Sequence, residues 1–217
     1  CYSSAMKWVA FLERFNDCAV IEPAMVYAGE PNPDALQAQL SRWVKAGRLI
    51  KLARGKYTLA PPYRKVDLPL EHVANRLVYP SYVSMESALA WYDLIPEAVA
   101  VVTSVTTARP RVLENVLGTF RYRHIRRRLF WGFESENLQE QECVVALPEK
   151  AILDFFYFRP GVATVEEMQE MRFQNLDRLD EKRLLALARR TGVKKLIIVT
   201  ERLMQYRSVF LKEYDFS

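Results

Sequence analysis

The stretch PDALQAQLSRWVKAGRLIKLARGKYTLA, residues 33–60, decides the fold of the first part of this chain. Its first half places Leu36, Leu40, Trp43 and Val44 at the spacing of a single helix face. This spacing predicts an amphipathic helix whose apolar stripe faces a core.

Both ends of this helix carry sequence signals. Asn32 is a favourable N-cap, and Pro33 suits the first helical position because it needs no amide hydrogen there. Asp34 complements the helix dipole, and Gly47 can end the helix in a left-handed conformation.

The surrounding segments complete a module. Residues 4–15 and 22–29 have helical patterns, and residues 48–53 and 56–60 are expected to be two short strands joined by a tight turn at Arg54-Gly55. The order helix, helix, helix, hairpin is typical of a winged helix-turn-helix, a module that places one helix in the major groove of DNA.

After Pro61-Pro62 the pattern changes to alternating helices and strands. We expect helices at 70–77, 85–93 (capped by Ser84) and 148–158, strands at 99–107, 119–125, 129–134 and 142–147, and a mostly helical tail from 164. Residues 196–200 are compatible with either a strand or a helical turn. The fold expected is therefore α+β: an N-terminal winged helix-turn-helix over 1–62, followed by a mixed α/β C-terminal domain over 63–217 with a helical tail.

Composition narrows the protein class. With 217 residues, 50% hydrophobic and 26% charged, the chain should bury a real core, which argues against disorder and coiled coils. No apolar run approaches the roughly 18 residues of a membrane span, so no membrane association is expected. Three separated cysteines and two histidines make a disulfide framework or a metal site improbable, so we expect a cytoplasmic location and no cofactor or metal.

The charge is unevenly distributed. Residues 1–65 contain 10 Lys or Arg and 5 Asp or Glu, and so carry the whole net charge of +5. Residues 109–128 contain seven arginines and one acid. A basic first domain and a local basic strip favour a polyanionic partner, although a solvated charged face is the commoner explanation of either.

The helix face opposite the apolar stripe supplies candidate DNA contacts. Glutamine can pair with adenine and arginine with guanine, whereas lysine and arginine on the hairpin suit phosphates. The candidates for base reading and its flanks are Gln37, Gln39, Ser41 and Arg42, and those for the backbone are Lys45, Lys51, Arg54 and Lys56. A solvated face or a protein-binding module is the alternative.

A second basic patch is predicted at Arg121, Arg123, Arg126, Arg127 and Arg128. If 119–125 is a strand, Arg121 and Arg123 face away from the apolar side. They could contact phosphates or form cross-strand ion pairs with Glu134–Glu142, and the ion pairs are slightly favoured.

Motifs of catalysis are absent from the sequence: no phosphate-binding glycine loop, nucleophile elbow or zinc-protease helix occurs. Lys150 and Asp154 have the spacing of a helical ion pair. Because no nucleophile, base and orienting group assemble, we expect no enzymatic activity.

Five motifs in order resemble the AbiEi family, the antitoxins of type IV toxin–antitoxin systems. They are GRLIKLARGKYTL (47–59), PSYVSMESALAWYDLIPE (80–97), VVTSVTTAR (101–109), GTFRYRHI (118–125) and ALPEKAILDFFYF (146–158). The resemblance covers about residues 5–160.

This resemblance implies two partners. The winged helix would bind inverted repeats of double-stranded DNA in its own promoter and repress the operon. The C-terminal domain would counteract a nucleotidyltransferase-like toxin encoded next to it, without necessarily contacting that toxin. The alternatives are a solitary winged-helix regulator whose C-terminal domain senses a ligand or protein, and a protein-interaction module that never meets DNA.

Overall fold

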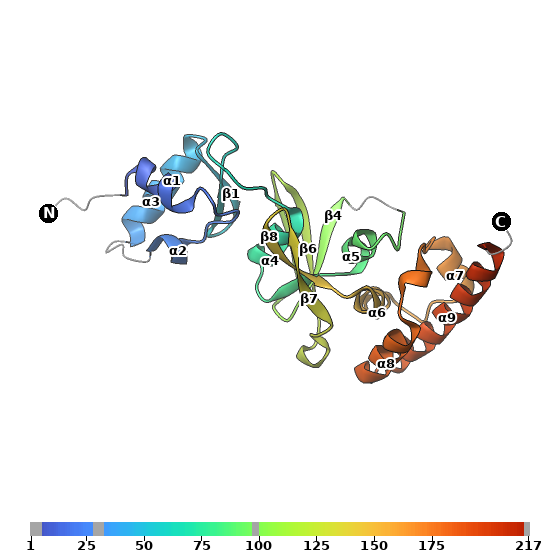
Figure 1. The fold of residues 1–217 in the computed structure, drawn as a ribbon. Coiled ribbons are helices and arrows are strands. Elements are labelled where there is room, and N and C mark those ends of the chain that lie inside the picture. The colour runs from blue at the N-terminus through green and yellow to red at the C-terminus, as the bar shows by residue number, and fades with distance from the viewer. Residues whose placement is uncertain (1–5, 28–32, 97–99, 215–217) are drawn as a thin grey trace.

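The computed structural model describes residues 6–27, 33–96 and 100–214, which form a mixed arrangement of helices and sheets (Figure 1). The first part holds three helices and a two-stranded hairpin. These elements are α1 (Trp8–Phe15), α2 (Pro23–Tyr27), α3 (Pro33–Lys45), β1 (Leu49–Ala53) and β2 (Lys56–Leu59). The predicted order of these elements is therefore confirmed.

The end of α3 follows the prediction from Gly47. Gly47 adopts a φ of 68°, and the backbone N–H of Arg48 donates to the carbonyl of Trp43 at 2.9 Å. This reversal directs the chain from α3 straight into β1. Asn32, the predicted N-cap, lies outside the described residues.

The second part is built on a six-stranded sheet with the order β5-β6-β4-β3-β8-β7. The pairs β3–β8 and β4–β6 are parallel, and the other neighbours are antiparallel. The strands are β3 (Ser81–Val83), β4 (Val101–Thr106), β5 (Arg111–Asn115), β6 (Gly118–His124), β7 (Phe133–Leu138) and β8 (Gln141–Ala146).

Helices cover both faces of this sheet. On one face, the hydroxyl of Tyr122 in β6 donates to the carbonyl of Ala74 in α4 (Leu70–Leu77) at 2.7 Å. On the other, the backbone N–H of Thr103 in β4 donates to the hydroxyl of Ser87 in α5 (Met85–Trp91) at 2.8 Å. Because helices cover both faces of the sheet, β4 has a nearly continuous run of buried residues.

The remaining helices form a helical layer beyond the sheet (Figure 1). They are α6 (Pro148–Phe158), α7 (Val165–Glu170), α8 (Glu181–Thr191) and α9 (Lys194–Tyr214); two short 3-10 turns, η1 (Arg127–Leu129) and η2 (Leu176–Arg178), complete this part. Thr164 and Glu167 form a reciprocal capping box at the start of α7, and Asp180 caps α8.

The buried apolar residues fall into two clusters. The smaller cluster lies within the first part and includes Phe11, Leu40 and Trp43. The larger cluster fills the second part, but it also receives Val20 and Leu52 from the first. The hairpin therefore packs against the second part instead of projecting from it.

Several sequence expectations need correction. The predicted strand at 129–134 is wrong: the chain forms η1 and then enters β7 only at Phe133. Strands β3 and β5 were not predicted, because β3 is too short to show a pattern and β5 is a mostly exposed strand at the edge of the sheet. Residues 196–200 lie within α9.

Ser84 precedes α5 as predicted, but its hydroxyl donates to Asp154 Oδ2 at 2.9 Å and makes no capping bond. The tertiary contact thus replaces the local one. Among the residues that the structure describes, no helix is long and apolar enough to cross a membrane.

Candidate nucleic-acid interface

Helix α3 has two chemically different faces. Leu36, Leu40 and Trp43 are buried, with Leu40 fully inaccessible, as the apolar stripe predicted. The Trp43 ring lies 4.7 Å from the ring of Phe11 and 5.1 Å from that of Trp8, both in α1. These aromatic contacts hold α3 rigidly and leave its other face outward.

The outward face of α3 is polar and cationic. Its exposed residues are Asp34, Gln37, Ala38, Ser41, Arg42 and Lys45, whereas Gln39 is half-buried. The small side chains of Ala38 and Ser41 leave the helix surface low, a shape that allows close approach to a groove.

All four of the predicted base-reading side chains already have partners in the protein. The Arg42 guanidinium donates to Gln39 Oε1, and the Gln37 amide donates to the hydroxyl of Tyr57 at 3.1 Å. The Ser41 hydroxyl donates to the carbonyl of Gln37. To contact DNA bases, these side chains would have to give up or share their hydrogen bonds within the protein.

The hairpin cations divide into two kinds. Lys51 and Arg54 are exposed and, within the described residues, neither forms an ion pair. The Lys56 ammonium instead lies 2.7 Å from the carboxylate of Glu22, which also binds Arg76 of α4 at 2.8 Å. Lys56 is therefore partly neutralised, which the sequence did not indicate.

The same contacts fix the first part against the second. Besides the Glu22–Arg76 pair, the side-chain amide of Asn115 in β5 donates to the carbonyl of Leu52 in β1 at 3.1 Å. Figure 1 shows the hairpin on the side of the first part that meets the sheet, with α3 beyond it. The polar face of α3 is thus not covered by the larger part.

The second predicted basic patch is split by the structure. Arg121 is exposed on β6, whereas the guanidinium of Arg123 lies 4.9 Å from the centre of the Phe158 ring in α6. Arg126 and Arg127 are exposed beside η1, and Arg128 donates to the carbonyl of Thr191 at 2.8 Å.

The favoured ion-pair role of these arginines is wrong. Strand β6 pairs with β4 and β5, whereas β7, which carries Glu134 and Glu136, lies at the opposite edge of the sheet and pairs with β8. Arginines of β6 therefore have no cross-strand partner among Glu134–Glu142.

A buried polar network lies under the sheet in the second part. Lys150 and Asp154 form the predicted (i, i+4) ion pair in α6, and both side chains are 2% exposed. Asp154 Oδ2 also accepts from the hydroxyls of Tyr82 (2.8 Å) and Ser84 (2.9 Å), and the ammonium of Lys150 donates to the Tyr82 oxygen at 2.9 Å.

Burial governs the ionisation of this network. It raises the pKa of Tyr82 well above the usual value, with the Asp154 charge adding to the effect. It lowers the pKa of Lys150, and Asp154 opposes that shift. Because its polar groups are paired with one another and buried, the network ties β3 to α6.

A cavity of about 660 Å³ opens between α5, α6, α7 and the start of α9. Its walls are mainly apolar, with charged groups at the rim, among them Glu86, Arg159, Glu170 and Lys195. The Arg159 guanidinium stacks on the Phe155 ring at 4.7 Å, and the Lys195 ammonium donates to the carbonyl of Arg159. Its volume suits a small organic molecule.

Within the described part of the chain, no group of three or more His, Cys, Asp or Glu side chains is placed to hold a metal ion. Comparison with known proteins adds no assignment: no protein-family model matches the sequence, and no curated protein matches it significantly.

Proposed function

We propose that the first part is a winged helix-turn-helix that binds double-stranded DNA, with α3 in the major groove and the β1–β2 turn as the wing. The observation that carries this proposal is the outward face of α3. It presents Ser41, Arg42 and Lys45 to solvent while the opposite face is locked into the core.

The candidate contacts divide by chemistry. Gln37, Ser41 and Arg42 suit base edges, with Gln39 holding the Arg42 guanidinium until DNA binds. Lys45, Lys51 and Arg54 suit phosphates. Lys56 can contribute only by leaving Glu22, so we rank it last.

We further propose that the protein is a cytoplasmic repressor of its own operon and the antitoxin of a type IV toxin–antitoxin system. Support comes from the resemblance to the AbiEi family in five motifs spread over both parts of the chain. The proposal assigns it no catalysis, cofactor or metal. Its partners are promoter inverted repeats and a neighbouring nucleotidyltransferase-like toxin.

Two experiments test this function. In a gel shift, the full chain should bind the DNA upstream of its own gene. The double variant Arg42→Ala with Lys45→Ala should lose the specific complex. The control variant Arg109→Ala with Lys182→Ala removes the same charge elsewhere and should keep it. If both pairs behave alike, α3 is not the reading element.

Co-expression with the adjacent gene product should restore growth, and failure to do so would remove the antitoxin role only.

A ligand-sensing regulator is the second candidate, and the 660 Å³ cavity favours it. Glu170→Trp would place a large ring at the rim. If an effector binds there, this variant should alter repression in cells while the purified protein keeps its affinity for DNA. Unchanged repression would count against the sensor.

A further inference from the structure

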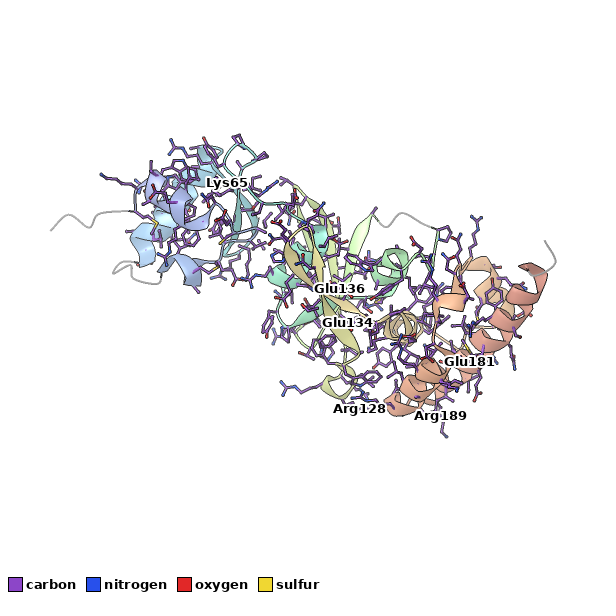
Figure 2. The ribbon with its side chains drawn as sticks, in the orientation of Figure 1. Lys65, Arg128, Glu134, Glu136, Glu181 and Arg189 are labelled. Atoms are coloured by element: carbon purple, nitrogen blue, oxygen red, sulfur yellow. The ribbon has the colours of Figure 1, made fainter. Side chains whose placement is uncertain are left out.

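Two arginine-rich segments that are far apart in the sequence meet in space at η1 and the end of α8. The Arg128 guanidinium donates to the carbonyl of Thr191 at 2.8 Å, and the Arg190 guanidinium lies 4.4 Å from the centre of the Trp131 ring. The Trp131 indole in turn donates to the carbonyl of Arg128 at 3.0 Å. Figure 2 shows Arg128 and Arg189 close together at this corner.

These contacts assemble a compact set of cations that we call the η1–α8 patch. Its members are Arg126, Arg127, Arg128, Arg189, Arg190 and Lys194. All six are exposed, and within the described residues none of them forms an ion pair.

Acidic residues are absent from the segments that build the patch. Neither 121–133 nor 182–200 contains an aspartate or a glutamate. No ion pair within the described residues offsets the positive charge of the η1–α8 patch, and this charge creates a field that attracts anions.

The chemistry of the patch favours phosphate groups. Five of its six cations are arginines, whose planar guanidinium matches phosphate with paired hydrogen bonds. Within the described residues, neither η1 nor α8 contributes an exposed large hydrophobic side chain, and the nearest in sequence is Ile198 of α9, so a protein partner would find little apolar anchor there. Neither 121–133 nor 182–200 carries an Asn or Gln that could pair with adenine, and an arginine can bind a phosphate without reading any base.

We propose that the η1–α8 patch binds the phosphate backbone of a nucleic acid, without reading its sequence and independently of α3. In Figure 2, Arg128 and Arg189 lie beside α8, well away from Lys65, which is next to the first part of the chain. The patch is thus a second polyanion site and not an edge of the α3 surface. It does not depend on α3 binding DNA.

The test measures binding of the full chain to a short duplex DNA of unrelated sequence and to an RNA strand of that sequence, by fluorescence anisotropy over a series of salt concentrations. The variant replaces Arg126, Arg127 and Arg189 with alanine. These side chains form no hydrogen bond or ion pair within the described residues, so folding should persist, and circular dichroism checks this.

The variant should weaken binding and flatten the dependence of log K on log salt, by about 2.7 for duplex DNA or about 2.1 for a single strand if each arginine neutralises one phosphate. The probe that shows this loss identifies the source. The matched control, Lys65→Ala with Arg109→Ala and Arg111→Ala, removes the same charge from exposed positions outside η1 and α8 and should leave the slope nearly unchanged.

Repeating the test in a protein whose α3 surface is already changed separates the two sites. The same loss should appear when Arg42 and Lys45 of α3 are already alanine, whether or not the protein binds its own operator. An equal loss in the control variant, or no loss with either probe, would overturn the proposal.

Discussion

Breaking the buried ion pair of α6 is expected to destabilise the protein through an uncompensated charge. Asp154→Asn keeps an oxygen that can accept from the Tyr82 and Ser84 hydroxyls but removes the negative charge beside Lys150. Because the Lys150 side chain is only 2% exposed, its ammonium cannot recover hydration. Removing one partner of such a pair costs about 3–5 kcal/mol.

The cost should depend on pH. Burial already lowers the pKa of Lys150, and Asp154→Asn removes the charge that opposes this shift. A lysine whose pKa is lower in the folded state binds fewer protons there than in the unfolded state. Stability is therefore lost as pH falls below the unfolded pKa, and the deficit of Asp154→Asn should shrink as pH rises from neutral toward 10.5.

Urea unfolding at neutral and alkaline pH measures both effects. Lys150→Met combined with Asp154→Asn removes both charges, so the double variant should be less destabilised than the sum of the two single variants. Additive losses, or a deficit of Asp154→Asn that is the same at both pH values, would refute the view that an unpaired buried charge causes the instability.

Three smaller perturbations test other parts of the structure. Gly132→Ala should destabilise the protein in a thermal melt, because Gly132 has a φ of 77° and an added Cβ would lie 3.1 Å from the Lys150 side chain; an unchanged melting temperature would contradict this. Thr164→Ala removes the α7 cap and should cost about 1 kcal/mol in urea unfolding, with Thr164→Ser as the control that retains it. Burial raises the pKa of the Cys143 thiol to about 11, so iodoacetamide at mildly alkaline pH should modify it only after denaturation, and rapid labelling of the native protein at Cys143 would show that β8 opens.

Local patterns predicted most of the elements that have a complete local signal. The stripe of α3, its end at Gly47 and the Pro148 start of α6 were all recognisable, because capping and helical periodicity depend on residues a few positions apart. The sequence did not predict β3 and β5, because these strands gain their stability from neighbouring strands of the sheet that are distant in the sequence.

The candidate sites show the same division. The exposed side of α3 could be predicted, since a helix with one apolar stripe must turn its other residues outward. The neutralisation of Lys56 by Glu22 could not, because this pair joins the hairpin to a residue 34 positions earlier and brings in Arg76 of α4.

From its residues alone, this chain specifies a basic helical module with a hairpin, an α+β class and the (i, i+4) spacing of Lys150 and Asp154, since these follow from patterns along single elements. The burial of that pair depends on the packing of α6 against β3. The sheet order keeps the β6 arginines away from the β7 glutamates, and the packing of η1 against α8 unites Arg126–Arg128 with Arg189 and Arg190. Both arrangements depend on which segments, distant in the sequence, come into contact. Those contacts are determined by the packing of the whole apolar core, which no local sequence pattern encodes.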